Sequence, residues 1–560
     1  MSRAGGFPPQ GFWGGATHFA SGVAFPPAPA EGDCFYRTDL NELFVWNGTT
    51  WVSWDVAPPS YIIYTDGVTT YAKNGVTGNI DFTGANVATV IQNAINACVL
   101  PPPINTGGKI LIKAGLYPMT AGLICNSNFI ILEGESEGAV YLRLDTPGMV
   151  ALTIGSVGSP NQISIKNISF VDNAGNTTTG MSLPGTGVAN SPGRIHVEAC
   201  TFVDCNRGIA GDWIQAMWID RCWFSNVRTA DMDIENISEL RIFHSIFWGS
   251  GNQGRGIDID SDKAVLSGGV TISDCLFIDH EDHAIIISDQ FIVFISNCIF
   301  DGIANGNCIR LIRCNDFRVY CNSVGATGGP FGAENIYLED PEDFWVTDNS
   351  CFTGNTNGIT VAMVGATRPA RGKIARNVIG NPLQHGIQVP NSIYVDIEDN
   401  IIFGVGAAAP NTYSAIRTGS ATPTNFDEGT VRNNRTFAMA NARYSLEHLA
   451  GNACEFGEND FKSGAIGIQT IAGAQHLRLP DLWSNLPTRN SGVATIPNGT
   501  ASIVVAHGLG GTPTSIRCTG THTEVDRVYV TAVGAANFTI NAGAGNVTAN
   551  RDVYWEAEVR

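Results

Sequence analysis

The sequence predicts an all-β protein whose main part is a right-handed parallel β-helix of about twelve coils. A short phrase that alternates apolar and polar residues returns through residues 163–461, and each copy closes on an apolar marker. Neighbouring markers are often 22 to 24 residues apart, as Phe202 and Phe224 are, and insertions lengthen the other intervals. Fixed strands joined by variable loops give this period in a solenoid. The markers are Phe170, Phe202, Phe224, Phe247, Phe277, Phe300, Val324, Phe352, Ile379, Ile402, Phe437 and Phe461.

The residue types within the phrases favour strands over the leucine-rich repeat, which shares the period. Leucine-rich repeats need recurrent leucines and a helical segment, whereas these phrases alternate and prefer Ile, Val and Phe. A second apolar pair follows most markers by about ten residues and indicates a second strand in each coil. We expect the markers to stack inside at roughly 4.8 Å per coil. Short polar residues three positions before a marker predict a buried ladder: Asn167, Asp274, Asn297, Asn349 and Asn434.

Composition and charge narrow the classes of partner. The chain has 64 glycines and 15% charged residues, which suits turn-rich β structure. Its net charge of −19 argues against nucleic acid and anionic membranes. Fourteen cysteines include no CxxC pair, and no histidine spacing typical of metal sites occurs, so we expect free buried thiols, no metal and no cofactor. Four cysteines lie two residues before a marker: Cys200, Cys222, Cys275 and Cys298.

Five segments are predicted along the chain. An amphipathic helix from Val87 to Cys98 is expected to cover the open end of the first coil, where a ladder edge would otherwise be exposed. Gly- and Pro-rich composition predicts the arm, and the Asn47-Gly48 turn between aromatic-rich strands predicts the N-terminal module. Short strands separated by Gly, Asn and Thr predict the C-terminal sandwich. The segments are a flexible arm (1–31), a small N-terminal β module (32–58), the capping helix with the first coils (66–160), the β-helix body (161–465) and a C-terminal β-sandwich (490–560).

No targeting or membrane segment is predicted. The N-terminus lacks a charged start followed by an apolar core, and no run of 18 apolar residues occurs. We therefore expect synthesis and folding in a cytoplasm.

Two parts of the chain resemble known families in their local motifs. Residues 32–55 resemble a module of tail-fibre and tailspike proteins of tailed viruses, with a GD-aromatic-aromatic pattern followed by aromatic-x-Trp. Residues 66–145 resemble the start of the pectate-lyase-like superfamily, which implies a β-helix but no particular activity. The residues that match the superfamily pattern are Gly107, Gly108, Gly115, Tyr117 and Gly134.

The C-terminal segment resembles terminal modules of tailspikes and fibres. Its HGLG-x-TP opening begins at His507, and Trp555 and Ala557 supply an aromatic-x-Ala strand. The joint resemblance implies a virion tail protein, extracellular after release, that binds a host cell-surface glycan without membrane insertion. It also implies a homotrimer and contact of the N-terminus with other tail or baseplate proteins. His507 is interpreted as a turn-stabilising residue rather than a catalytic one.

The densest acidic surface is predicted on two consecutive coils. Strand parity turns Asp231 outward with Asp233 and Glu235, and likewise Asp258, Asp260 and Asp262. Glu235 and Asp258 each lie eleven residues after a marker, so we expect them to be neighbours one coil apart. Crowded carboxylates raise one pKa and create a proton donor, which predicts glycoside cleavage by an acid and a base or nucleophile. The candidate catalytic residues are Glu235, Asp258, Asp233 and Asp260.

Further residues are candidates for substrate binding, and other functions stay open. Trp223 and Trp248 are expected outside, beside their markers, whereas Trp218 has the parity of the core. Polygalacturonase phrases are absent, and basic residues are scarce, which favours hydrolysis over elimination. The alternatives are a non-catalytic adhesin, a structural fibre, or an acidic face that is merely solvated or binds a cation. The candidate binding residues are Trp223, Trp248, Asp282, His283 and Arg310.

Overall fold

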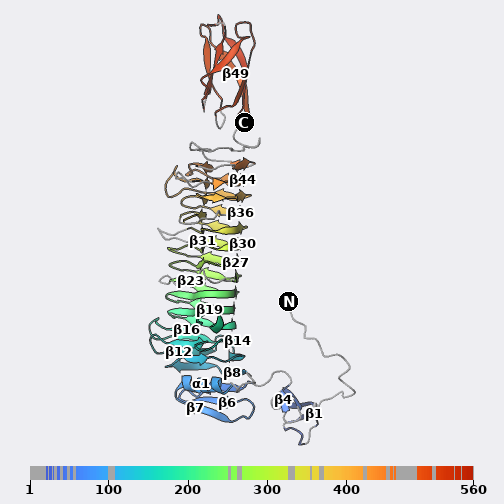
Figure 1. Ribbon diagram of the computed structural model, residues 1–560, viewed down its shortest axis with the longest axis vertical. Coiled ribbons are helices and arrows are strands. Elements are labelled where there is room, and N and C mark those ends of the chain that lie inside the picture. The colour runs from blue at the N-terminus through green and yellow to red at the C-terminus, as the bar shows by residue number, and fades with distance from the viewer. Residues whose placement is uncertain are drawn as a thin grey trace.

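The structure, a computed structural model, places most of the chain in one elongated stack of coils (Figure 1). It describes residues 20–22, 24–27, 30, 34–37, 42–46, 51–53, 59–98, 107–249, 254–261, 268–325, 334–353, 356–364, 371–419, 426–449, 454–457, 459–461, 489–507, 512–534, 537–543 and 545–558.

The stack is a parallel β-helix, as predicted, and each coil has three strands. In a representative coil, β24 leads to β25 and then to β26, and each strand pairs in parallel with its counterpart in the next coil. We call the three resulting surfaces the first, second and third faces. The first and third faces belong to a 28-stranded sheet, and the second is a 14-stranded sheet.

The strands of each face follow in chain order. The first face contains β8 (Gly108–Ile112), β11 (Ile130–Gly134), β14 (Asn161–Lys166), β17 (Gly193–Glu198), the second halves of β19 (Arg207–Asp220) and β21 (Ala230–Phe243), β24 (Gly269–Ser273), β27 (Phe291–Ser296), β30 (Asn315–Tyr320), β33 (Glu342–Thr347), β36 (Gly372–Ala375), β40 (Val395–Glu398), β44 (Thr430–Arg432) and β47 (Glu455–Gly457). The second face contains β9 (Gly115–Met119), β12 (Val140–Leu144), β15 (Ser169–Asp172), β18 (Thr201–Val203), β20 (Trp223–Ser225), β22 (Ile246–Trp248), β25 (Leu276–Ile278), β28 (Ile299–Asp301), β31 (Ser323–Gly325), β34 (Ser350–Phe352), β37 (Val378–Gly380), β41 (Ile401–Phe403), β45 (Arg435–Phe437) and β48 (Asp460–Phe461). The third face contains β10 (Leu123–Cys125), β13 (Val150–Ile154), β16 (Thr179–Pro184), the first halves of β19 and β21, β23 (Arg255–Asp260), β26 (Ile285–Ser288), β29 (Ile309–Ile312), β32 (Ile336–Glu339), β35 (Ile359–Ala362), β38 (Ile387–Val389), β42 (Ile416–Thr418) and β46 (Leu446–His448).

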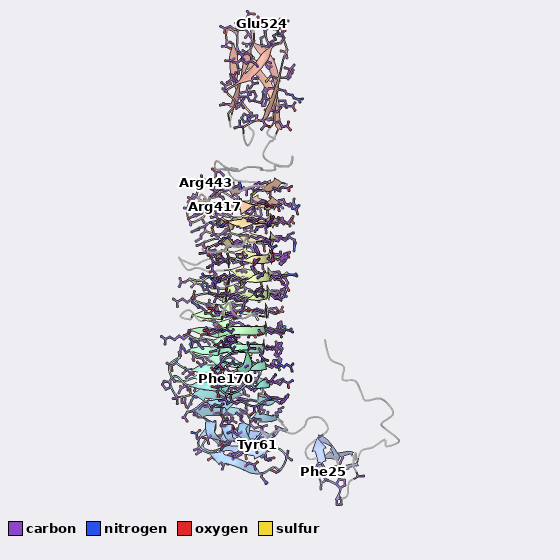
Figure 2. All side chains as sticks on the ribbon, viewed as in Figure 1. Phe25, Tyr61, Phe170, Arg417, Arg443 and Glu524 are labelled. Carbon is purple, nitrogen blue, oxygen red and sulfur yellow. The ribbon has the colours of Figure 1, made fainter. Side chains whose placement is uncertain are left out.

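The predicted markers form a stack of phenylalanine rings inside the second face. Phe170, labelled in Figure 2, begins a run of six rings that ends at Phe300. Consecutive ring centroids are 4.7 to 5.2 Å apart, and the planes are almost parallel. Offset-stacked rings add attraction to the burial of their apolar surface. This stack therefore fixes the register of the second face over six coils.

Two later markers are wrong by one residue. Phe352 and Phe437 are 38% and 37% exposed, and the interior positions belong to the residues before them, Cys351 and Thr436. Successive side chains of a strand point to opposite faces, so a shift by one residue exchanges inside and outside. The sequence interpretation chose the bulkier residue, whereas the register of the neighbouring coils selects the smaller one.

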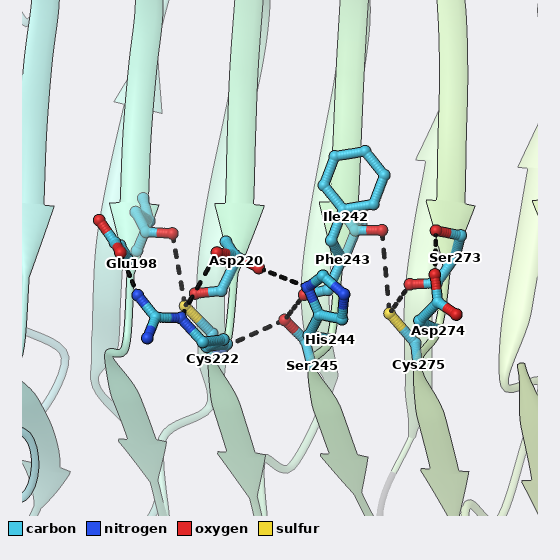
Figure 3. A network of polar contacts seen from close by, with 12 residues as sticks. Glu198, Asp220, Cys222, Ile242, Phe243, His244, Ser245, Ser273, Asp274 and Cys275 are labelled. Atoms are coloured by element: carbon cyan, nitrogen blue, oxygen red, sulfur yellow. Dashed lines mark hydrogen bonds and ion pairs between the residues drawn. The ribbon is translucent and has the colours of Figure 1, made fainter. Parts of the chain in front are cut away.

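A second buried column lies at the turn between the first and second faces. Its early members include Cys222, Ser245 and Cys275 (Figure 3), and six hydrogen-bonded asparagines continue it. Asn349 and Asn434 belong to this ladder, as predicted. Asn167, Asp274 and Asn297 instead lie one residue before the column in left-handed conformation, with φ of 54 to 56°, which short polar side chains tolerate. The ladder is Asn322, Asn349, Asn377, Asn400, Asn434 and Asn459.

The helix α1 (Val87–Ala97) covers the start of the stack, as predicted. Asn86 caps it by accepting a hydrogen bond from the Thr89 backbone at 3.1 Å, and an apolar stripe of six residues is buried. The Gln92 side chain donates to the Ile124 carbonyl at 2.9 Å and accepts from the Ile124 backbone N–H at 2.7 Å. Its amide thus satisfies the free edge of β10 as a neighbouring strand would.

The remaining strands outside the C-terminal segment lie before the first coil or in loops. β1 (Ala20–Gly22) pairs with β2 (Cys34–Arg37), which continues into β3 (Glu42–Trp46) and β4 (Trp51–Ser53). A strand thus lies within segment 1–31, which we expected to be an arm. The antiparallel strands β5 (Tyr61–Thr65), β6 (Thr70–Asn74) and β7 (Ile80–Gly84) join the first face through β8. A short helix η1 (Val188–Asn190) and the pair β39 (Ser392–Ile393) and β43 (Phe426–Asp427) lie in loops.

Two three-stranded antiparallel sheets enclose a separate core in the C-terminal segment. One contains β49 (Arg489–Ile496), β54 (Arg551–Glu558) and β51 (Ser515–Gly520), and the other β50 (Ser502–Ala506), β53 (Asn537–Ala542) and β52 (Val528–Thr531). His507 is buried there, and its Nε2 lies 3.1 Å from the Gly534 carbonyl oxygen. This contact holds two loops together.

Candidate functional site

The predicted acidic residues lie on the third face, with a register that differs from the expectation. Glu235 lies opposite Asp212 in one neighbouring coil and opposite Asp260 in the other. Asp258 lies opposite Asp233, so Glu235 and Asp258 are diagonal rather than direct neighbours. The loop between Phe247 and β23 is two residues longer than the corresponding loop after Phe224, and this insertion shifts the register. Counting from the markers could not reveal it.

Asp231 was wrongly expected on the surface. Its side chain is 1% exposed, and the Nε2 of the buried His280 lies 3.7 Å from its Oδ2. Burial raises the pKa of Asp231 well above its ordinary value and lowers the pKa of His280 to about 4. Strict alternation does not hold at the start of β21, where Ala230, Asp231 and Met232 are all buried, and the His280 ring lies against Asp231. Asp262 lies outside the described residues.

Two arginines border the carboxylate cluster, which we define as Asp212, Asp233, Glu235, Asp258 and Asp260. Arg207 Nε lies 2.6 Å from Asp233 Oδ2. Arg255 contacts Asp258 and, through its Nε at 3.1 Å, Asp282. The pKa of Asp258 is nevertheless raised, because its burial outweighs the attraction of Arg255.

Glu235 combines exposure with a raised pKa. Partial burial is the main cause, and the surrounding carboxylates of Asp212, Asp233 and Asp260 add to it by repulsion. Among the described residues, its side chain forms no hydrogen bond or ion pair, whereas Asp212 accepts a hydrogen bond from Asn236 at 2.9 Å. Glu235 is thus the member of the cluster that best fits a proton donor open to a ligand.

The predicted binding residues Asp282, His283 and Arg310 are only partly brought to this cluster. Asp282 reaches Arg255, as described above. His283 Nδ1 accepts a hydrogen bond from the Asn307 backbone at 2.8 Å, so its neutral ring carries the proton on Nε2, 3.5 Å from Asp282 Oδ1. Burial lowers the pKa of His283. Arg310 lies two strands beyond Asp258 and donates to Glu339 at 2.9 Å.

The arrangement around His283 recurs four coils later. His385 Nδ1 accepts a hydrogen bond from the Ser414 backbone at 3.0 Å, and Arg417 Nη1 lies 3.3 Å from His385 Nε2. The same hydrogen bond from the next coil to a turn histidine occurs at His283, whose Nδ1 accepts from the Asn307 backbone. The hydrogen bond to the histidine Nδ1 therefore joins consecutive coils, and His283 has a structural role independent of any ligand.

Two of the three tryptophans point outward as predicted, and the third was assigned wrongly. Trp223 and Trp248 are 45% and 40% exposed, as predicted, but they belong to the second face rather than to the carboxylate face. Trp218 was wrongly assigned to the core, because the buried residues of its strand are Met217 and Ile219. Trp218 is half-buried and points outward on the first face.

A groove on the first face was missed in the sequence. A pocket of about 600 Å³ is lined by Phe294, Arg318, Trp345 and Lys373 on four successive strands, together with Tyr320 and Arg376. Basic residues are thus not scarce on this part of the coils. The sequence contains a signal for this alignment, because each of the four strand residues lies six positions before an interior residue of the second face. These interior residues are Phe300, Val324, Cys351 and Ile379.

Two other kinds of feature are absent from the described residues. No group of three or more His, Cys, Asp or Glu side chains there has an arrangement that could hold a metal ion. None of the described helices is long and apolar enough to cross a membrane.

Comparisons with known proteins agree with the fold. Residues 155–292 match the family described as right handed beta helix region. No curated protein matches the chain.

Solved structures of similar shape include phage tailspikes and an epimerase module. The Pseudomonas phage phi297 tailspike gp61 is 11% identical, with a TM-score of 0.45 over 84% of this chain and 92% of that chain. A double mutant of the tailspike protein of E. coli bacteriophage HK620 is 11% identical, with a TM-score of 0.48 over 90% and 98%. The Azotobacter vinelandii mannuronan C-5 epimerase AlgE6 A-module is 13% identical, with a TM-score of 0.33 over 70% and 95%. At these values the likeness extends to the general fold only.

Proposed function

We propose that this protein is a tailspike of a tailed virus that binds host cell-surface polysaccharide and hydrolyses it at the carboxylate cluster of the third face. The β-helix fold and the tail-protein motifs at both ends of the chain support the virion role. The observation that carries the hydrolytic step is the meeting of five carboxylates on three neighbouring strands, with a raised pKa at the exposed Glu235. Glycoside hydrolysis needs such a pair of carboxyl groups on either side of one bond.

In this mechanism Glu235 is the general acid that protonates the leaving oxygen. Asp260, directly opposite, or Asp258, on the diagonal, is the second carboxylate. Neighbouring parallel strands are about 4.8 Å apart, and a carboxyl separation near 5.5 Å favours retention, whereas about 6.5–9.5 Å leaves room for water and favours inversion. The direct pair Glu235 and Asp260 thus fits retention, with Asp260 as the nucleophile. The diagonal pair Glu235 and Asp258 fits inversion, with Asp258 as the general base.

The pH dependence follows from the raised pKa of Glu235. The acid must be protonated, so the rate falls as pH rises through that pKa, and it falls at low pH when the second carboxylate becomes protonated. The expected profile of kcat/KM is bell-shaped. A Glu235→Gln variant is expected to lose at least about a hundredfold in rate.

The test uses purified protein, surface polysaccharides from candidate hosts, and mass spectrometry of the products. Glu235→Gln, Asp258→Asn and Asp260→Asn should keep the fold and lose cleavage, and Glu239→Gln on the same strand β21 is the matched control. New reducing ends without unsaturation are expected. Unsaturated products detected by ultraviolet absorbance would replace hydrolysis by elimination, and unchanged cleavage in all three variants would exclude the cluster.

A non-catalytic adhesin is the second candidate, and the groove on the first face favours it. Aromatic and basic side chains gather there without any member of the carboxylate cluster. Glycan binding in the absence of products, across hosts that the virus infects, would support this function. A purely structural fibre would show neither binding nor cleavage.

The proposed function includes assembly into a homotrimer whose N-terminal module contacts other tail or baseplate proteins. Exposed apolar side chains on the second face, Trp223, Trp248 and Ile299, support burial against other copies. Light scattering of the purified chain should give three times the mass of 59.5 kDa. A monomer at micromolar concentration would contradict this assembly.

A further inference from the structure

Aromatic and basic side chains alternate along the outside of the first face. Strand register places Arg318 opposite Phe294 on one side and opposite Trp345 on the other. Trp345 in turn lies opposite Lys373. Because parallel strands repeat about every 4.8 Å, the four side chains extend over about 14 Å along the stack. This row is separate from the carboxylate cluster, which lies on the third face.

The guanidinium of Arg318 is held between two aromatic rings. Its Cζ lies 5.2 Å from the ring centroid of Trp345 and 5.8 Å from that of Phe294. Such cation–π contacts orient a guanidinium without neutralising it. The side chain is exposed, and Trp345 beside it is 37% exposed, so both are open to a ligand.

Arg318 differs from its neighbours in having no counter-ion among the described residues. Lys373 contacts Glu398, and Arg376 makes two bonds to Asp348 at 2.6 and 2.7 Å. In a chain with a net charge of −19, an unpaired cation between two rings is a specific feature rather than part of a basic surface. Its hydrogen-bond donors remain available for an anion.

The shape of the groove fits a small ligand unit. Its volume of about 600 Å³ is within the range of ligand sites, and Tyr320 and Lys373 provide polar groups at its edges. A ring of a sugar could lie against the exposed Trp345 while an acidic substituent reaches Arg318. The planar guanidinium matches a carboxylate by two parallel hydrogen bonds.

We propose that this groove binds a carboxylate-bearing sugar residue of the polysaccharide, with Arg318 on the carboxylate and Trp345 against the sugar ring. The proposal rests on the proposed function in so far as the ligand is a polysaccharide, and it adds that this polysaccharide is acidic. It requires neither cleavage nor the carboxylate cluster.

The experiment measures binding of oligogalacturonate to the full chain by isothermal titration calorimetry, with a neutral glucan oligosaccharide and a sulfated glucan oligosaccharide of equal length beside it. Oligogalacturonate is expected to bind more tightly than both, and its affinity should fall with added salt. Arg318→Gln should weaken binding about 10- to 100-fold, as expected for loss of a charge-assisted hydrogen-bond pair. Trp345→Leu should also weaken it.

Two variants serve as controls. Arg241 occupies the same outward row, opposite Trp218 and Thr271, and its Nη2 is paired with Glu239 at 2.6 Å, so Arg241→Gln should bind within about twofold of the wild type. Arg318→Lys keeps the charge but not the planar fork, and intermediate affinity is expected. Circular dichroism and melting temperature confirm that each variant is folded.

The outcomes separate this proposal from the proposed hydrolysis. Equal affinity of oligogalacturonate and the neutral oligosaccharide, or wild-type affinity in Arg318→Gln, would overturn the groove assignment whether or not the protein cleaves glycans. Equal affinity for the sulfated oligosaccharide would overturn the preference for a carboxylate. Cleavage is assayed separately, so binding of oligogalacturonate that depends on Arg318 supports the groove even where cleavage is absent.

Discussion

The two halves of the β-helix fill the same buried column with different chemistry. In the first half the column contains Cys200, Cys222, Cys275 and Cys298, beside the stack of six phenylalanine rings. In the second half it contains six asparagines, from Asn322 to Asn459, beside smaller interior residues such as Val324 and Cys351. The change occurs between two adjacent coils, since the Cys298 backbone donates to Asn322 Oδ1 at 2.9 Å.

The cysteine and asparagine side chains both contact a backbone carbonyl at the equivalent position of the preceding coil, and the asparagine forms the stronger hydrogen bond. The Sγ of Cys298 lies 3.8 Å from the Ile272 carbonyl oxygen, whereas Asn322 Nδ2 donates to the Ile295 carbonyl at 3.0 Å. A thiol is a weak donor, but each amide in the ladder also donates to the next amide and accepts from the previous one. The first half thus depends mainly on ring packing, and the second half on a connected polar network. Variants in each half can test this difference.

The largest effect is expected from breaking the asparagine network at its centre. Asn377 donates to the Val346 carbonyl at 2.9 Å and accepts from the backbone of Asn349 at 3.0 Å. Asn377→Ala leaves both buried groups without partners, and we expect the free energy of unfolding to fall by about 4 kcal/mol. Urea denaturation followed by fluorescence measures this. A loss below about 1 kcal/mol would mean that the ladder is not a stabilising network.

A smaller effect is expected from the phenylalanine stack. Phe247 has stacked neighbours at 4.8 and 4.7 Å, and Phe247→Leu keeps most of the buried area but removes both ring contacts. We expect a loss of about 2 kcal/mol in the free energy of unfolding. The exposed Phe352→Leu is the matched control and should change stability by less than about 0.5 kcal/mol. Equal effects of the two substitutions would contradict the assignment of Phe247 to the interior.

The thiol column is expected to tolerate substitution better than the asparagines. Cys275→Ala removes one buried atom and weak contacts to the carbonyls of Ser273 and Ile242 at 3.2 and 3.9 Å. The expected loss is about 1 kcal/mol, measured in the same urea titration. A loss as large as that of Asn377→Ala would remove the proposed contrast between the halves.

The smallest expected effect is a gain, and it concerns a polar pair that the first half leaves unsatisfied. Among the described residues, neither carboxylate oxygen of Asp231 has a hydrogen-bond partner. Its raised folded pKa means that the folded state retains a proton that the unfolded state releases above pH 3.8, so the cost to stability grows as pH rises. Asp231→Asn should therefore stabilise the protein at pH 7, because the amide stays neutral without having to retain a proton. The gain should disappear near pH 3, and a gain that is independent of pH would contradict this origin.

The sequence predicted the repeating parts of the molecule and missed features that depend on loop length. The interior rings from Phe170 to Phe300 and the thiols of Cys200, Cys222, Cys275 and Cys298 repeat at fixed offsets, so their environment could be inferred from one coil. Helix α1 could be predicted from its own apolar spacing. The acidic surface was found by the same parity rule, and Asp233, Glu235, Asp258 and Asp260 do share one face. Its pairing was wrong because the loop after Phe247 is longer than the loop after Phe224.

By itself, the sequence determined that the chain winds into coils, which residues of most coils face inward, and that acidic side chains gather on two coils. Local alternation and repeat length are sufficient for these features, because each strand buries every second residue in the same interior. Only the tertiary structure decided which outward residues become neighbours, because loops of unequal length set the register between coils. It therefore placed Asp260 opposite Glu235 and buried Asp231 against His280.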